Sequence, residues 1–253
     1  MYDFNRHWHE NAERKTPSQK KTIARNFLRP VFDRLDQSLG SQRILDAGCG
    51  DGVHAEILSE RHTSVTFFGV DISIVALKLA QQKDLPQAEF QIANVSKLPY
   101  KDESFDISFS VGVLGYLDSP IQAFQELCRV TKKDGLVGVQ VHQKRDDIMG
   151  LLWTATRKIC NVFGPTVTKI IADCIVPFLG VLPTQSRMSL KNSTWKQCRE
   201  IILVNIDPFI LHCFRHSEVK NWFKNNDCEI VENLPSSPIA IWGESAKTFY
   251  SQE

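Results

Sequence analysis

The stretch RILDAGCGDG, residues 43–52, decides the fold, because an apolar run enters a glycine-rich turn there. Gly48, Gly50 and Gly52 give the spacing G-x-G-x-G. Glycine lets the backbone turn sharply and approach a ligand without interference from a Cβ atom. The dinucleotide spacing G-x-G-x-x-G would need its third glycine at position 53, where Val53 stands. The turn therefore predicts a site for a nucleotide-like ligand other than NAD, and disfavours an NAD-dependent oxidoreductase.

Two acidic residues flank this turn and narrow the chemistry of the ligand. Asp46 lies two residues before Gly48, and Asp71 ends the apolar run SVTFFGVD nineteen residues after Gly52. A carboxylate repels a pyrophosphate and attracts an ammonium group. An acidic residue at the end of the second strand can accept hydrogen bonds from ribose hydroxyls. The pair fits a ligand that has an amino acid end and a ribose but no phosphate.

Around the turn, short β-branched runs alternate with helical patterns. Strands are predicted at 43–49, 64–71, 88–95, 104–113, 135–142, 228–234 and 239–243, and the clearest helices at 17–39, 119–131 and 216–227. This alternation favours a parallel sheet with helices on both faces, and right-handed crossovers make such a sheet doubly wound.

The same pattern divides one predicted domain, 1–253, into four segments. They are an N-terminal helical arm or lid (1–40), a cofactor-binding core (41–142), a helical cap inserted after the fifth strand (143–206), and a C-terminal helix with strands that complete the sheet (207–253). The insertion is apolar enough to form a substrate cap or a homodimer surface. It could also hold a lipid tail or touch a membrane surface.

Composition excludes several classes of protein. A chain of 253 residues with 42% hydrophobic and 23% charged residues is ordinary for a globular protein. A formal net charge of +1 gives no general attraction for nucleic acid. The longest apolar stretch, 170–182, is interrupted by Asp173 and falls short of the roughly 20 residues that span a bilayer. We therefore expect no nucleic-acid partner, no transmembrane segment and no secretory signal.

The seven cysteines have no paired spacing, which indicates neither a disulfide framework nor a zinc site. Several stand beside apolar residues and are predicted to be reduced, buried thiols of a cytoplasmic protein: Cys128, Cys160, Cys174 and Cys213. No metal is predicted.

Further motifs follow the glycine turn in a fixed order. Within residues 43–142 the chain contains four motifs in succession: ILDAGCGDG, GVDIS, NVSKLPYKDESFDISFSVGVLGYLDSP and CRVTKKDG. In this order they resemble the motifs of class I S-adenosylmethionine-dependent methyltransferases. The resemblance implies a Rossmann-like α/β sheet of about seven strands with the last strand antiparallel, S-adenosyl-L-methionine as cofactor, and methyl transfer as the reaction.

The resemblance also implies which residues bind the cofactor. The methionine end would contact Asp46, Gly48, Cys49, Gly50 and Gly52; the ribose would contact Asp71; the adenine would contact Ile72, Asn94 and Val95; and Ser110 and Val111 would lie beneath the methyl group. Two departures stand out. Asn94 occupies a position where relatives more often carry Asp, and Gly115–Tyr116 stands where relatives often carry a histidine. The second departure leaves the identity of a general base open.

A wider resemblance covers both ends of the chain. Phe4 and Trp8 in F-x-x-x-W, and the segment 207–223, are similar to a methyltransferase subgroup of bacterial glycan and secondary-metabolite pathways. It implies that Trp8, Asp207, Phe209 and His212 are candidate acceptor-contacting residues. Tyr116 and His142 are further candidates, the second because it ends the fifth strand at the edge where ligands bind in such sheets. A hydroxyl acceptor needs a general base, and histidine suits this role near neutral pH. The catalytic candidates are His142, His216 and Tyr116, and each also has a purely structural interpretation.

Three functions remain open at this point. The first is O- or N-methylation of a small molecule in a biosynthetic pathway. The second is methylation of a lipid- or carrier-linked intermediate. The third is a methyltransferase-like domain that binds a partner without catalysis, and the intact glycines with Asp46 and Asp71 disfavour it.

Overall fold

The computed structural model describes residues 5, 17–38, 40–178, 195, 198–199, 202–203, 212–234 and 238–246. The chain divides into two compact units. The first comprises residues 1–143 and 212–253, and the second comprises residues 144–211. The roles of 1–40 as a lid and of 143–206 as a substrate cap stay predictions.

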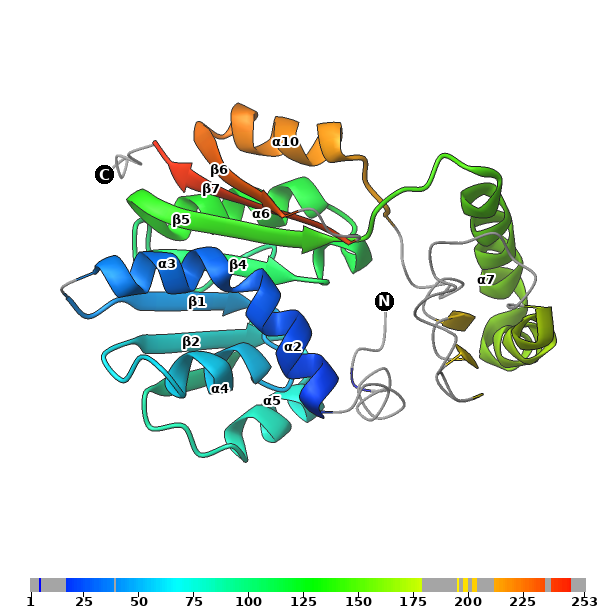
Figure 1. Cartoon of the computed structure of the whole chain (residues 1–253), viewed down its shortest axis with the longest axis horizontal. Coiled ribbons are helices and arrows are strands. Elements are labelled where there is room, and N and C mark those ends of the chain that lie inside the picture. Colours follow the sequence, from blue (N-terminus) through cyan, green and yellow to red (C-terminus); the bar gives the residue numbers. More distant parts are fainter. Residues whose placement is uncertain are drawn as a thin grey trace. The chain divides into compact units, whose positions relative to one another are not determined.

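The first unit contains a seven-stranded sheet with the order β3-β2-β1-β4-β5-β7-β6 (Figure 1). Its strands are β1 (Arg43–Ala47), β2 (Thr66–Asp71), β3 (Ala88–Ile92), β4 (Phe105–Val111), β5 (Thr131–Val141), β6 (Cys228–Leu234) and β7 (Ile239–Ser245). The first five strands pair in parallel, and β7 runs antiparallel to both β5 and β6. The predicted α/β sheet of seven strands with an antiparallel last strand is confirmed.

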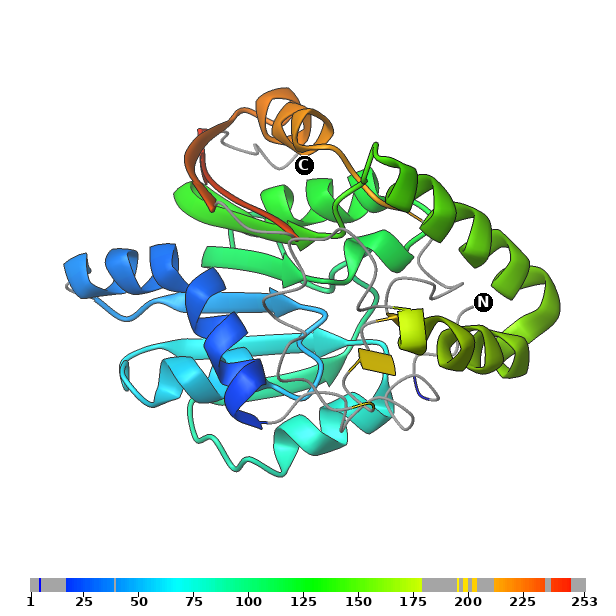
Figure 2. The same ribbon diagram turned by 45° about the vertical axis from the view of Figure 1, so that its right-hand side comes forward.

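Helices cover both faces of this sheet (Figures 1 and 2). On one face, α2 (Pro17–Phe27), α3 (Arg29–Gln37) and α4 (Val53–Ser59) share a core with Ile44 of β1. On the other face, α6 (Pro120–Val130) and α10 (His216–Asn225) share a core with Leu45. Successive residues of a strand point to opposite faces, so Ile44 and Leu45 anchor the two layers from one strand. A further helix, α5 (Ile74–Gln81), packs against β2 and β3.

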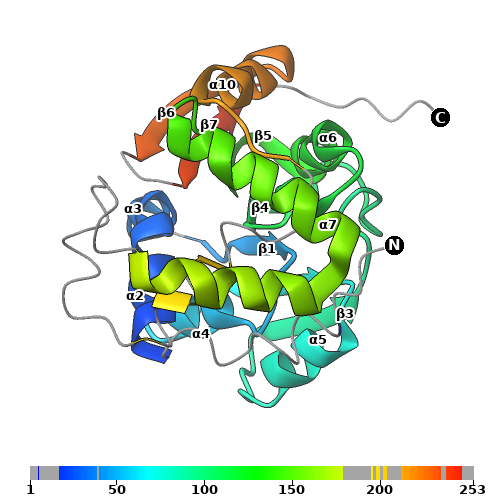
Figure 3. The ribbon, with the colours of Figure 1, turned by 90° about the vertical axis from the view of Figure 1, so that its right-hand side faces the viewer.

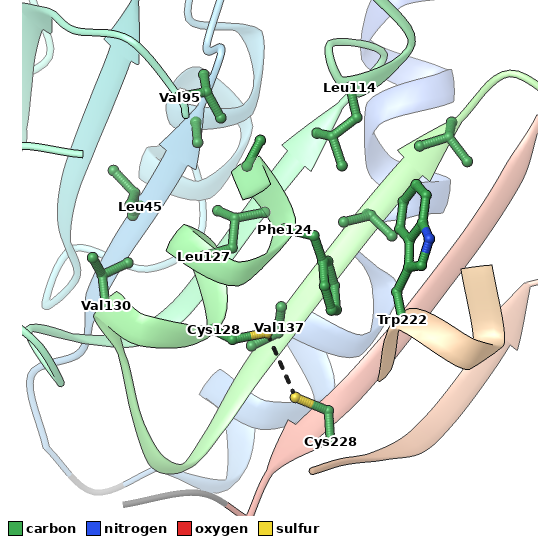
Figure 4. Packing of buried hydrophobic residues seen from close by; sticks show 14 of the residues in the cluster. Leu45, Val95, Leu114, Phe124, Leu127, Cys128, Val130, Val137, Trp222 and Cys228 are labelled. Atoms are coloured by element: carbon green, nitrogen blue, oxygen red, sulfur yellow. Dashed lines mark hydrogen bonds between the residues drawn. The ribbon is translucent and has the colours of Figure 1, made fainter. Parts of the chain in front are cut away.

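Figure 4 shows the second of these cores, where Phe124 and Leu127 of α6 pack beside Trp222 of α10. The sulfur atoms of two buried cysteines, Cys128 and Cys228, lie 3.8 Å apart in this core. All seven cysteines are in the reduced thiol form, as predicted. The prediction that they are buried is right for Cys128 and Cys160 and wrong for Cys174, which is exposed, and for Cys213, which is half-buried.

Several predicted element boundaries were wrong, most by one or two residues, and the three largest differences have a physical reason. The single helix expected over 17–39 is two helices, because Pro30 has no N–H to donate and ends the first helix's hydrogen-bond ladder. The third strand ends at Ile92 and does not reach 95, since the Oδ1 atom of Asn94 accepts a hydrogen bond from the Ser96 N–H and forms a local turn. The fifth strand begins at Thr131 instead of 135. A salt bridge stabilises the charged first residues of this strand, since the Nζ atom of Lys132 lies 2.7 Å from an oxygen of Asp106.

The second unit is dominated by α7 (Ile148–Ile175), followed by the short 3-10 helix η2 (Val176–Phe178). Gly164 has a φ of 81°, and α7 bends there into two arms, which Figure 3 shows in green and yellow-green. A small core joins the arms to more distant residues: Cys160, Ala172, Val176, Ile202 and Leu203. Within the described parts of the chain, no helix combines the length and the apolar character needed to cross a membrane.

Candidate cofactor and acceptor site

The glycine turn joins β1 to α4 at the edge where the parallel strands end (Figures 1 and 2). Its three glycines have positive φ angles: 91° at Gly48, 54° at Gly50 and 72° at Gly52. The N–H groups of Gly48 and Cys49 donate to the carbonyl oxygen of Val70 at 2.7 and 2.9 Å. The turn is therefore tied to β2, and only glycine adopts this series of left-handed conformations readily.

Gly48 also lies against another part of the chain. A Cβ atom at this position would stand 2.2 Å from Cγ2 of Val113, far inside van der Waals contact. The first glycine of the motif is thus required both by its φ angle and by the close approach of Val113.

Asp46 lies fully buried on β1, just before the turn. Its Oδ2 atom lies 2.8 Å from Nδ1 of His54, which is 7% exposed on α4. Its other oxygen, Oδ1, is buried and has no hydrogen-bond partner among the residues that the structure describes. A buried carboxylate oxygen without a donor is costly. Asp46 can therefore accept a hydrogen bond from a ligand's ammonium group, while His54 fixes the orientation of the carboxylate.

Asp71 ends β2 and points both of its oxygens at backbone donors. Oδ2 accepts from the N–H of Gly50 at 2.9 Å, and Oδ1 accepts from the N–H of Ser73 at 2.8 Å. Burial raises the pKa of the Asp71 carboxyl, and the hydrogen bonds from Ser73 and Gly50 oppose this rise. Each carboxylate oxygen retains a lone pair, so Asp71 can also accept from ribose hydroxyls. Because Asp71 accepts this hydrogen bond from Gly50, it also stabilises the glycine turn.

The remaining predicted cofactor residues differ in what their side chains can reach. Ile72 is 44% exposed beside Asp71 and can pack on a flat ring. Val95 is buried in the core, so it can contact a ligand only through its backbone. The Oδ1 atom of Asn94 already accepts from Ser96. The buried hydroxyl of Ser110 donates to the carbonyl oxygen of Ala47 at 2.6 Å and ties β4 to β1 beneath the turn.

Cys49, within the turn, is buried between the two acids. Burial raises the pKa of its thiol well above the ordinary value, and the charges of Asp46 and Asp71 add to the rise. The thiol stays protonated at neutral pH and packs as a small apolar group. It therefore adds no negative charge to the site.

The acceptor-side candidates meet on the loop after β4. The 3-10 helix η1 (Leu114–Tyr116) places the Tyr116 ring 5.6 Å from the His142 ring in an edge-to-face arrangement. A Cβ atom on Gly115 would stand 3.0 Å from Cδ2 of His142 and 2.9 Å from the carbonyl oxygen of His212. The N–H of His212 donates to the carbonyl oxygen of Gly115 at 2.9 Å. Glycine at 115 thus leaves the space in which the His142 ring lies.

The other acceptor-side candidates are less informative. His216 begins α10, and its buried Nδ1 has no hydrogen-bond partner within the described residues. None of the contacts between described residues joins His216 to the ring pair of Tyr116 and His142. Trp8, Asp207 and Phe209 lie outside the described residues.

Two residues near the site had no signal in the sequence. His54 follows the third glycine by two residues, at a place where nothing in the local pattern indicates a partner for Asp46. Asn5 is the one residue before Pro17 that the structure describes, and its Oδ1 accepts from the hydroxyl of Ser73 at 3.0 Å. A local sequence pattern cannot show this contact, because 68 residues separate its partners.

These features fit S-adenosylmethionine. The orphan oxygen of Asp46 suits its ammonium group, the backbone of the glycine turn suits its chain, and Asp71 suits its ribose. The fold and this site define the class I S-adenosylmethionine-dependent methyltransferases. The family described as "Methyltransferase domain" matches residues 45–139, so this part of the chain is an S-adenosylmethionine-dependent methyltransferase domain of that class.

Similar proteins agree with this assignment. The chain is 32% identical over 124 residues to "O-methyltransferase resE" of Aspergillus sclerotiorum, which covers 46% of each protein. It is 26% identical over 171 residues to the malonyl-[acyl-carrier protein] O-methyltransferase of Legionella pneumophila, covering 66% of this chain and 58% of that protein. The matches therefore span about half the length of these relatives.

Solved structures show the same fold at lower identity. The magnesium protoporphyrin IX methyltransferase of Synechocystis, with bound S-adenosylhomocysteine, has a TM-score of 0.60 at 15% identity and covers 96% of both chains. A complex of the Haloferax volcanii Trm112 activator with a methyltransferase gives a TM-score of 0.63 at 13% identity, covering 98% of this chain and 100% of that chain. At these identities the likeness concerns the fold alone.

The close contact at Gly48 gives a testable prediction. We expect Gly48→Ala to weaken binding of S-adenosylhomocysteine about tenfold, because a left-handed conformation costs a non-glycine residue about 1–2 kcal/mol and the new Cβ meets Val113. Isothermal titration calorimetry measures this change. Adding Val113→Ala should recover part of the lost affinity by removing the clash, and equal affinity of Gly48→Ala and wild type would contradict the close approach.

Proposed function

We propose that the protein transfers the methyl group of S-adenosylmethionine to an oxygen of a small molecule in a biosynthetic pathway. The observation that carries this proposal is the position of His142. It follows β5 at the edge where the glycine turn lies, and it packs against Tyr116 beside Gly115. A hydroxyl becomes a good nucleophile only when a base takes its proton, so a histidine at this edge favours oxygen as the acceptor atom.

The protein's own residues would bind the cofactor, orient the acceptor and remove the proton of the acceptor hydroxyl. Asp46 and the turn 48–52 would hold the methionine end, and Asp71 would hold the ribose. S-adenosylmethionine supplies a methyl group on a positively charged sulfur, which an acceptor attacks in line. His142 would accept the proton of the acceptor hydroxyl at a ring nitrogen, and the Tyr116 ring would limit where the acceptor lies. Alignment of the two reactants then lowers the barrier.

A second candidate acceptor is a carrier-linked carboxylate. The relative from Legionella pneumophila, whose match covers 66% of this chain, is named for methylating malonyl-[acyl-carrier protein] on oxygen. A carboxylate is ionised at neutral pH and needs no base. Under this alternative, His142 would position the acceptor without taking a proton, and its loss would leave the pH profile of turnover unchanged.

We also propose that the protein acts in the cytoplasm, which its seven cysteines, all in the reduced thiol form, support. The near-neutral net charge of +1 supports an acceptor other than nucleic acid. A homodimer through 143–206 stays a prediction that light scattering would test.

The assignment of the cofactor has a direct test. In calorimetry the full chain should bind S-adenosylhomocysteine and should not bind NAD. With radiolabelled S-adenosylmethionine and a panel of phenols, carboxylic acids and amines, we expect label in the phenol products. Binding of NAD alone would overturn the assignment, and label confined to amines would overturn the choice of oxygen.

A further inference from the structure

The first arm of α7, residues 148–163, carries an exposed row of apolar side chains. Val162 is 79% exposed, Ile148 77%, Leu151 70% and Phe163 65%. We call the full row the apolar stripe: Ile148, Leu151, Leu152, Ala155, Ile159, Val162 and Phe163. At 3.6 residues per turn, these positions fall within roughly 120° of the helix circumference. The stripe is therefore a continuous apolar face.

The stripe is not the face that holds the second unit together. Trp153 and Cys160, on the other side of the same arm, pack with Ala172, Val176 and Ile202 in the unit's core. The arm thus has two apolar faces. One packs into the described core of the second unit, and the other, the apolar stripe, is exposed. A contiguous exposed apolar face on a protein usually marks a binding surface.

The arm carries positive charges and no acidic residue, which favours an anionic partner. Residues 148–172 contain Arg157, Lys158 and Lys169 and no Asp or Glu. By helical spacing, Lys158 borders the stripe, and it is exposed. The acidic residues at the ends of α7 are already paired: Asp147 with Arg145 at 2.5 Å and Asp173 with Arg199 at 2.5 Å.

A hydroxyl group beside the stripe is satisfied within the helix. The hydroxyl of Thr156, next to the stripe by helical spacing, donates to the carbonyl oxygen of Leu152 at 2.8 Å. Moving this side of the arm into a less polar environment therefore leaves few hydrogen bonds unmade. A helix of this length measures about 24 Å, which is too short to span a bilayer but long enough to lie along its surface.

We propose that residues 148–163 dock on the surface of a membrane that contains anionic phospholipid. The apolar stripe enters the boundary between head groups and acyl chains, and Lys158 contacts the phosphates at its border. Gly164, where the helix bends, ends the inserted arm. Docking would bring the methyltransferase domain to acceptors that are dissolved in the lipid or held at its surface.

The test uses the full chain and sucrose-loaded vesicles of phosphatidylcholine, with or without phosphatidylglycerol. Wild type should sediment with the phosphatidylglycerol vesicles. Val162→Glu and Leu151→Glu should each lower the partition coefficient by about tenfold or more, as expected when one buried aliphatic side chain is lost. Lys158→Glu should remove the preference for phosphatidylglycerol.

Thr154→Glu is the matched control, because it places the same charge at an exposed position of the same arm outside the stripe. It should sediment like wild type, and all variants should bind S-adenosylhomocysteine equally. Failure of wild type to sediment would overturn the proposal, as would an equal loss in Thr154→Glu. A dimer in light scattering that Val162→Glu dissolves, with vesicle binding unchanged, would assign the stripe to a second copy of the chain instead.

Discussion

His142→Ala is expected to lower kcat by about 10²–10³-fold near neutral pH and to leave the affinity for S-adenosylhomocysteine unchanged. The first effect is the usual contribution of a positioned general base. The second follows because no described contact joins the His142 ring to the glycine turn or to Asp71. Its neighbours are Tyr116 and Gly115. Turnover with a phenol acceptor and calorimetry with S-adenosylhomocysteine measure the two quantities.

The pH dependence separates a base from a residue that only holds the site together. When pH approaches the acceptor's own pKa, the phenol ionises without help, so the defect of His142→Ala should shrink. His216→Ala is the control, since His216 is a histidine of the same unit without a described contact to this ring pair. Equal kcat values for His142→Ala and wild type at neutral pH would reject the base.

The cofactor half of the site could be predicted because its signals are local. Three glycines within five residues have positive φ angles, and only their spacing in the sequence is needed to anticipate the turn. The ends of β1 and β2 follow from short apolar runs, which place Asp46 and Asp71 at one edge of a parallel sheet. The backbone geometry and the chemistry of the two acids therefore follow from neighbouring residues.

The acceptor half depends on contacts between distant segments. The contact of His142 with Gly115 joins the end of one strand to the loop after another, and no periodicity encodes it. The pairing of Asp46 with His54 requires the turn itself to fold the helix back beside the strand. The departure at Gly115–Tyr116 was visible in the sequence, but its reason is the space that His142 occupies. The predicted end of the third strand failed for a different, local reason, since Asn94 forms a turn in competition with the strand.

Asp71→Ala is expected to weaken binding of S-adenosylhomocysteine by about 3 kcal/mol, roughly a hundredfold, because charged hydrogen bonds to the ribose are lost. The same change leaves the buried N–H of Gly50 without its acceptor, so the turn also loses support. Asp51→Ala is the matched control. Asp51 is a carboxylate of the same turn that pairs with Lys20 at 2.7 Å, and its loss should change the affinity little. Equal effects of the two substitutions would place the ribose elsewhere.

The pH dependence of binding tests the same contact through its charge. Ribose hydroxyls donate to an ionised carboxylate, so affinity should fall as pH decreases through the pKa of Asp71 and the carboxyl takes up a proton. Burial raises that pKa, so the fall should begin at a higher pH than an exposed aspartate would give. Asp71→Asn should bind more weakly at neutral pH and should lack this acid limb. If the affinity of the wild type stays constant as the pH is lowered through the usual pKa range of an aspartate, Asp71 does not contact the ligand. The reason is that a carboxylate that takes up a proton loses one of the lone pairs with which it accepts hydrogen bonds.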